Sequence, residues 1–145
     1  MTISKSDVEQ FFHRYALAFK DGLEGSLDMK ALRSLYSSQF IAAGPQGVMA
    51  GDNDDAFGER MSKGYEHYRK IGTKAMTVTA VEMHSIDETH CLAHVGWNSK
   101  FEKDGEDIDV PFTNTYLLEL SDGKLKAFGW ITGDEVQLLK DNGLM

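Results

Sequence analysis

The sequence has little that would suit an oxidising compartment, a membrane or a nucleic acid. One cysteine is present, Cys91, so no disulfide can form within the chain and a reducing compartment is favoured. No stretch approaches the roughly 18 apolar residues of a membrane-spanning helix, and residues 1–7 lack the basic and apolar blocks of a signal peptide. The net charge of -8 repels phosphate backbones and anionic lipid. We therefore expect a soluble cytoplasmic domain that binds neither nucleic acid nor membrane.

The chain also lacks any repeat, linker or low-complexity segment. Its 145 residues suit one domain that is long enough to bury roughly two thirds of its unfolded surface. The hydrophobic fraction of 41% and the charged fraction of 26% are ordinary for a globular protein. We therefore expect residues 1–145 to form a single domain.

The first seventy residues have apolar side chains at helical spacing. Ser6 and Glu9 stand at the spacing of a capping box, and Asp21-Gly22 ends the apolar stripe that follows them. Asp28 is suited to cap a shorter helix, and Gly72 is suited to end a longer one. These features predict helices over residues 4–20, 28–36 and 52–71, with a short strand over residues 39–43.

From Lys74 onward the apolar spacing changes to two residues, which predicts long β-strands. Asp104-Gly105 and Asp122-Gly123 are dipeptides that close tight hairpins. We expect one strand over residues 76–86, three more between Thr89 and Thr132, and a last short helix begun by a Thr132 and Glu135 capping box. Each of the two middle strands shows one clear face. In the first strand this face is formed by Cys91, Ala93, Val95, Trp97, Ser99 and Phe101. In the second strand it is formed by Ile108, Val110, Phe112, Asn114, Tyr116, Leu118 and Leu120.

For two of the predicted strands, the sequence does not decide which face is directed toward the core. In the strand over residues 76–86, His84 could face inward as a general base, although exposure near the strand end is favoured. The last strand offers either Phe128 and Trp130 or a second set to the interior. That second set consists of Leu125, Ala127 and Ile131.

Helices followed by a run of long antiparallel strands are typical of an α+β protein. Three helices before one curved sheet predict a cone-shaped α+β barrel, with the N-terminal helices packed in the concave face of a mainly antiparallel sheet. Residues 35–40 ahead of Gly44-Pro45, the hairpin glycines and residues 116–130 resemble the nuclear transport factor 2-like superfamily. This superfamily includes SnoaL-like polyketide cyclases and ketosteroid isomerases. The resemblance implies a pocket inside the cone and a homodimer formed through the outer sheet face.

The resemblance to the isomerases includes hydroxyl donors but not the base. The isomerase pattern has an aspartate base beside the proline after the short strand, and here Gly44 takes that position. A tyrosine of the first helix and an acid of a late strand in that branch correspond to Tyr15 and Tyr116. An enolising isomerase needs both donor and base, so the resemblance argues against that activity. The catalytic candidates are Tyr15, His84 and Tyr116.

The inward faces are rich in aromatic residues, which favours either a filled core or an apolar cavity. Tyr15, Asn114 and Tyr116 could orient a ligand, and a buried Asn114 amide would need hydrogen-bond partners. We predict a pocket for a small apolar or cyclic molecule, without cofactor or metal; the alternative is a non-catalytic dimerisation or ligand-binding domain. The predicted lining is Tyr15, Phe19, Phe57, Met61, Tyr65, Trp97, Phe112, Asn114, Tyr116 and Trp130.

The other histidines and the cysteine have simpler interpretations. His90 and His94 share a strand face but lie about 13 Å apart at roughly 3.3 Å per residue, too far to share a metal. Both are opposite the apolar face, which favours the surface or a dimer interface. His13 and His67 are expected to be exposed on helices, and Cys91 is expected to be a small buried hydrophobe.

Overall fold

The computed structural model describes residues 2–144. The chain begins with three helices and a short hairpin and continues with four long strands and a last helix. In chain order the elements are α1 (Lys5–Glu24), α2 (Met29–Arg33), β1 (Tyr36–Gly44), β2 (Gly47–Asp52), α3 (Asp55–Lys70), β3 (Thr73–Ser85), β4 (His90–Lys103), β5 (Glu106–Ser121), β6 (Lys124–Ile131) and α4 (Glu135–Asp141).

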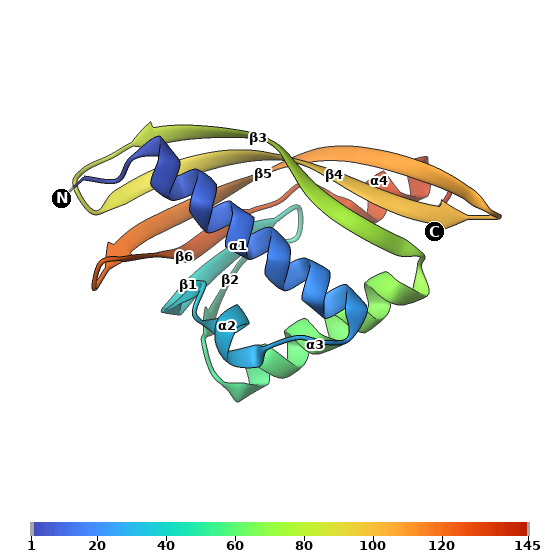
Figure 1. Cartoon of the computed structure of the whole chain (residues 1–145), viewed down its shortest axis with the longest axis horizontal. Coiled ribbons are helices and arrows are strands. Elements are labelled where there is room, and N and C mark those ends of the chain that lie inside the picture. Colours follow the sequence, from blue (N-terminus) through green and yellow to red (C-terminus); the bar gives the residue numbers. More distant parts are fainter. Residues whose placement is uncertain (1, 145) are drawn as a thin grey trace.

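All six strands belong to one curved sheet in the order β2-β1-β6-β5-β4-β3. β1 and β6 run parallel, and every other neighbouring pair is antiparallel. The sheet stays open, with β2 and β3 at its edges. α1 lies along one face of this sheet, and α3 packs beside α1 (Figure 1). The predicted α+β class, with helices against a curved, mainly antiparallel sheet, is confirmed.

The alternation predicted for β4 is confirmed residue by residue. Its odd-numbered positions from Cys91 to Phe101 are buried, while the even-numbered positions are half-buried. Both predicted hairpin turns are present, because Asp104-Gly105 and Asp122-Gly123 all have positive φ values between 52° and 79°. Turns of this left-handed type match the twist of the flanking strands. Pro111 lies beyond Thr115, where the pairing of β5 with β6 ends, so it sits at an open edge as its missing N–H requires.

A β-bulge in β6 decides which side chains of that strand face the core. Leu118 pairs with Ala127 but Leu117 pairs with Gly129, so one extra residue, Phe128, interrupts the alternation. Leu125 and Ala127 therefore face the core before the bulge, and Trp130 faces inward after it. The interior receives members of both predicted sets, while Phe128 packs against His90 on the outer face.

The helix ends differ from the sequence-based expectation at several points. The capping box of α1 is formed by Ser4 and Asp7, two residues earlier than the predicted pair Ser6 and Glu9. α1 continues through Gly22 and ends at Gly25, whose φ of 78° is the left-handed value of a C-cap. α2 begins after Asp28 as predicted but is short, because Tyr36 already belongs to β1.

The β2 strand was missed from the sequence. It pairs with β1 through residues 47–52 and is exposed along nearly all its length, so no apolar alternation marks it. The same pairing extends β1 to nine residues, beyond the predicted 39–43. α3 begins after Asp54, whose side chain caps it, because Asp52 is still part of the hairpin.

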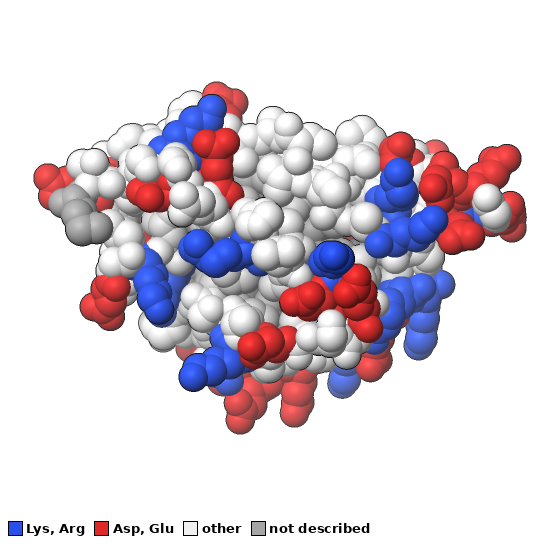
Figure 2. Space-filling model, in the orientation of Figure 1, with Lys and Arg blue, Asp and Glu red and all other residues white. Residues whose placement is uncertain are grey.

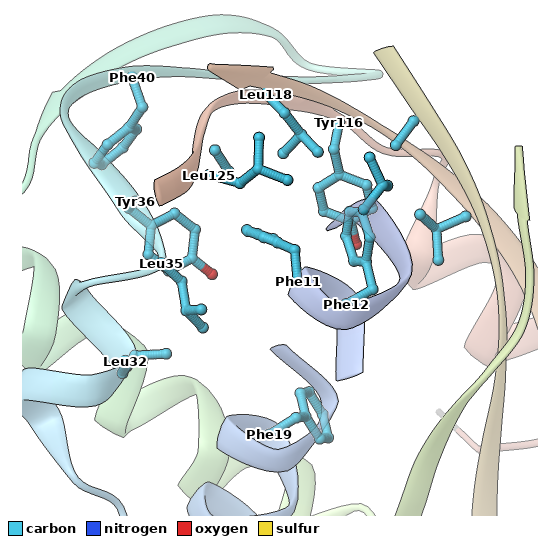
Figure 3. Close-up of a cluster of buried hydrophobic side chains, with 14 of the residues drawn as sticks. Phe11, Phe12, Phe19, Leu32, Leu35, Tyr36, Phe40, Tyr116, Leu118 and Leu125 are labelled. Atoms are coloured by element: carbon cyan, nitrogen blue, oxygen red, sulfur yellow. The ribbon is translucent and has the colours of Figure 1, made fainter. Parts of the chain in front are cut away.

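Aromatic side chains of α1 form the centre of the main core. Phe11 and Phe12 are fully buried, and Phe12 meets Tyr116 of β5 at 4.8 Å between ring centres (Figure 3). Burying each such side chain stabilises the fold by roughly 1.5–3 kcal/mol. A second, smaller cluster of Phe101, Val110 and Leu139 holds α4 against the far end of β4 and β5.

The surface mixes charges of both signs. On the face shown in Figure 2, Lys and Arg alternate with Asp and Glu and do not gather in one patch. Within residues 2–144, no helix is long and apolar enough to cross a membrane.

Candidate functional site

A cavity of about 660 Å³ lies between the helices and the inward face of the sheet. α1 and α3 supply one wall, β5 and β6 the opposite wall, and the segment leading into α4 the rim. Its volume lies within the range of about 300–1,000 Å³ that is usual for small-molecule sites. The lining residues are Tyr15, Phe19, Tyr36, Arg60, Met61, Gly64, Tyr65, Tyr68, Met76, Ser99, Phe101, Val110, Pro111, Phe112, Thr113, Asn114, Tyr116, Trp130, Thr132, Gly133, Asp134, Glu135, Leu138 and Leu139.

Buried hydroxyl groups gather at the inner end of this cavity. The Tyr36 hydroxyl donates to the Tyr15 hydroxyl at 3.2 Å, and Trp97 Nε1 donates to the Tyr116 hydroxyl at 3.1 Å. The Tyr15 and Tyr116 rings lie 5.5 Å apart between centres. Because each of these two oxygens already accepts from a donor in the core, its own proton is available for a neighbour or a ligand.

These hydroxyls are held in the neutral form. Burial raises the pKa of Tyr15 well above its ordinary value, and nearby Tyr116 and Tyr36 raise it further. Burial also raises the pKa of Tyr116, although hydrogen bonds with Asn114, Trp97 and Tyr15 oppose part of that rise. At the other wall, burial raises the pKa of Tyr65 to about 12. The inner end of the cavity therefore offers hydrogen-bond donors at neutral pH, and its tyrosines do not act as bases.

The rim of the cavity is charged. Arg60 of α3 and Asp134 and Glu135 at the start of α4 all line it. Tyr68 donates a hydrogen bond of 2.6 Å to Glu135 and so ties α3 to α4 across the opening. Burial raises the pKa of Tyr68, and the Glu135 carboxylate raises it further.

The rim arrangement corrects the predicted capping box of the last helix. Asp134 caps α4 by accepting from the Gln137 backbone N–H at 3.0 Å. Glu135 is thereby displaced from a capping position, and its carboxylate is free to accept from Tyr68. Only a local capping role could be predicted for Glu135 from its neighbours in the chain, because its partner Tyr68 is 67 residues away.

Eight of the ten predicted lining residues do line the cavity; Phe57 and Trp97 do not. Phe57 packs at 4.7 Å from Phe40 between ring centres, where it fills the core beneath β1. Trp97 is fully buried behind Tyr15 and Tyr116, where it donates a hydrogen bond to Tyr116 and lies 5.7 Å from Tyr15 between ring centres. Whether the eight residues contact a ligand remains a prediction.

His84 lies on the opposite side of the sheet from the cavity. The inward positions of β3 are Met76, Val78, Val81 and Met83, with a register shift between Val78 and Ala80. His84 is half exposed and bonded to Glu82, so it cannot serve the cavity as a base. Its exposure near the strand end agrees with the favoured interpretation of the sequence.

Several cavity residues are not identifiable from the local sequence pattern. Arg60 and Tyr68 lie on α3. The apolar residues Phe57, Met61, Tyr65 and Tyr68 form one stripe of this helix, which includes Tyr68 but gives no reason to select the charged Arg60. Asp134 and Glu135 lie after the last strand, and only the return of the chain over the sheet brings them to the rim. The position of Tyr68 on the same helical stripe as Met61 and Tyr65 was the one available signal.

The family is now evident from the fold and from a direct comparison. The model of a family described as NTF2-like protein (DUF6841) matches residues 5–135. The chain belongs to this NTF2-like family. The superfamily resemblance drawn from the sequence is thereby confirmed, and a search of curated proteins finds no match to this NTF2-like chain.

Solved structures share the NTF2-like fold at low sequence identity. An NTF-2 like protein of unknown function from Shewanella oneidensis is 18% identical, with a TM-score of 0.67 over 91% of this chain and 100% of that one. The beta subunit of benzoate 1,2-dioxygenase from Burkholderia mallei is 15% identical, with a TM-score of 0.70 over 96% and 95%. A ketosteroid isomerase-like protein from Erwinia carotovora atroseptica is 14% identical, with a TM-score of 0.61 over 88% and 93%. At these identities the comparison shows the fold alone.

Proposed function

We propose that this protein binds a small cyclic, largely apolar molecule that has a hydrogen-bond acceptor such as a ketone oxygen. The observation that supports the proposal is the set of neutral tyrosine hydroxyls at the inner end of an aromatic cavity of about 660 Å³. An apolar ring would replace water against Phe19, Phe112 and Trp130. The acceptor atom would take the hydroxyl proton of Tyr116, whose oxygen already accepts from Trp97, because a buried donor is costly to leave unpaired.

The proposal is for binding and does not include proton abstraction. In the described part of the chain, the inner end of the cavity is formed by hydroxyl, amide and aromatic groups, and the carboxylates of Asp134 and Glu135 stand at the rim. Asp134 is engaged as a helix cap and Glu135 as the acceptor of the Tyr68 hydroxyl. Gly44, where the isomerase branch has its base, lies against Thr132 at the end of β1. A cytoplasmic location stays a prediction from the sequence.

The test uses matched pairs of ligands. The full chain is titrated with bicyclic ketones and with the hydrocarbons of the same ring skeleton, and binding is followed by calorimetry or by tryptophan fluorescence. We expect the ketones to bind more tightly, and we expect Tyr116→Phe to weaken ketone binding about fivefold to tenfold, as for the loss of one net hydrogen bond of about 1 kcal/mol. Hydrocarbon binding should be unchanged in that variant.

Two controls separate binding from folding. Thr113→Ala alters a rim position of the same strand and should leave the preference for ketones intact. Phe112→Trp narrows the cavity and should weaken ketones and hydrocarbons alike. If no ligand of either class binds the wild-type protein, or if Tyr116→Phe weakens both classes equally, the proposal is wrong.

A second candidate function is supported by the outer face of the sheet. Ala43 of β1 pairs in register with both Val48 and Ile131, so these two side chains share a face with Ile41. All three are exposed, by 40% at Ile41, 69% at Val48 and 51% at Ile131. We propose that this apolar patch forms part of a homodimer interface with a second copy of the chain.

Light scattering and native mass spectrometry test this interface. The wild-type protein should be a dimer at micromolar concentration, and Val48→Lys should shift it to monomer because a lysine would place an unpaired charge in an apolar interface. Thr77→Lys, on the outer face of the distant edge strand β3, is the matched control and should leave the dimer unchanged. A wild-type monomer at tens of micromolar would exclude the interface.

A further inference from the structure

Two histidines from neighbouring strands meet on the outer face of the sheet, away from the cavity. Glu82 of β3 pairs in register with His94 of β4, and His84 pairs with Leu92. His84 is therefore diagonal to His94 across the strand pair, a separation that long side chains can bridge. The centres of the two imidazole rings lie 5.1 Å apart, and the ring planes are inclined by 78°.

Each ring has one nitrogen held by a neighbouring side chain. His84 Nε2 lies 3.1 Å from Glu82 Oε1, and His94 Nδ1 lies 2.8 Å from Thr115 Oγ1. The other nitrogen of each ring, His84 Nδ1 and His94 Nε2, has no hydrogen-bond partner in the described part of the chain. Histidines that bind metals are oriented in this way, with the second nitrogen bonded to a carboxylate or another oxygen.

The separation of the rings fits two ligands of one metal ion. A Zn–N bond is about 2.1 Å, so the centre of a coordinating imidazole lies about 3.2 Å from the ion, and a tetrahedral angle then places two ring centres about 5.2 Å apart. The observed 5.1 Å agrees with this value. Edge-to-face packing of two rings also allows this distance, but it does not account for the orienting partner that each ring has.

We propose that His84 and His94 bind a late first-row divalent metal ion, such as Zn²⁺, Ni²⁺ or Cu²⁺, through His84 Nδ1 and His94 Nε2. Imidazole favours these ions over Mg²⁺ and Ca²⁺, which prefer oxygen ligands. Among residues 2–144 no group of three or more His, Cys, Asp or Glu side chains is arranged to hold a metal. The site therefore has two protein ligands, and water completes the coordination.

The proposal is tested on the full chain purified without a histidine tag. Titration calorimetry with NiCl₂, ZnCl₂ and MgCl₂ at about pH 7.5 should show one Ni²⁺ or Zn²⁺ per chain and no Mg²⁺ binding. Two-dimensional NMR of the imidazole rings should show shifts at His84 and His94 on adding Zn²⁺.

Variants distinguish the pair from isolated surface histidines. His84→Gln and His94→Gln should each weaken Ni²⁺ binding at least about tenfold, because a single imidazole loses the advantage of two linked ligands. Glu82→Gln should weaken it by about tenfold through loss of the orienting carboxylate. His90→Gln is the matched control, since His90 is on the same strand face but bonded to Asp87, and it should leave affinity unchanged.

Circular dichroism of every variant must match the wild type, so that a change in metal affinity cannot come from a loss of folded structure. The proposal is wrong if the wild-type protein binds neither Ni²⁺ nor Zn²⁺, or if the His84→Gln and His94→Gln variants bind as tightly as wild type. It is also wrong if His90→Gln weakens binding as much as they do.

Discussion

Two glycines in helix interiors should respond to alanine with opposite changes in stability. Gly22 of α1 faces Tyr65 of α3, and a Cβ at Gly22 would lie 2.7 Å from three atoms of the Tyr65 ring. Tyr65 cannot easily move away, because it is buried and its ring packs edge-on against Phe19 at 5.3 Å. Gly64 of α3, in contrast, has no atom within 4 Å of its Cβ position.

The magnitudes follow from two opposing effects. Replacing glycine by alanine within a helix favours folding by about 1 kcal/mol, because alanine loses less backbone entropy. Forcing a methyl group into a packed contact costs about 1–3 kcal/mol. Gly64→Ala meets only the first effect and should stabilise the protein by about 1 kcal/mol. Gly22→Ala meets both and should destabilise it by up to about 2 kcal/mol.

Urea unfolding followed by tryptophan fluorescence measures both changes. The free energies of unfolding are extrapolated to water, and equal slopes show that the two variants unfold from comparable native states. A Gly22→Ala variant as stable as Gly64→Ala would refute the claim that close packing of α1 on α3 requires glycine at position 22. Gly22→Ser, which adds a larger side chain, should be less stable than Gly22→Ala.

Three further predictions concern ionisation, reactivity and turn geometry. Burial raises the pKa of all five tyrosines, so the unfolded chain loses its phenolic protons at a lower pH than the folded protein does. The free energy of unfolding should therefore be intact below pH 10 and should fall above it by up to about 1.4 kcal/mol per pH unit for each tyrosine. Circular dichroism with absorbance at 295 nm should show ionisation and unfolding together, and a separate ionisation near pH 10 in the folded protein would contradict this. Burial also raises the pKa of the Cys91 thiol to about 11. A disulfide reagent at pH 8 should therefore label Cys91 only after urea unfolds the chain, and rapid labelling of native protein would be inconsistent with that burial. Asp122 has a φ of 52° in its hairpin turn, a conformation that a β-branched residue adopts only at a cost. Asp122→Val should therefore lower the free energy of unfolding by about 1–2 kcal/mol, while Asp122→Asn should leave it nearly unchanged. Equal stabilities of the two variants would argue against this turn conformation.

Local patterns in the sequence were sufficient to predict much of the sheet. The strict alternation from Cys91 to Phe101 identifies a strand with one buried face, because side chains in a strand point alternately to opposite sides. The Asp-Gly dipeptides at 104–105 and 122–123 identify the hairpins, because both residues must adopt positive φ. Each of these features depends on residues that are close together in the chain.

Features that depend on distant pairing required the structure. The bulge at Phe128 exists because Leu117 and Leu118 of β5 pair with Gly129 and Ala127, and nothing in the sequence of β6 alone specifies it. β2 was invisible for the same reason, since its exposed side chains show no alternation. Tyr68 reaches Glu135 across 67 positions of the chain.

The sequence by itself determined the α+β class, the inward face of β4 and β5 and most of the aromatic lining of the cavity. Only the tertiary structure placed Trp97 behind the cavity wall, brought Glu135 to its rim and set His84 beside His94. The physical reason is that the period of the apolar side chains selects the buried face of each element. Which residues of two elements meet depends on strand register and helix packing, and these are fixed only when the whole chain folds.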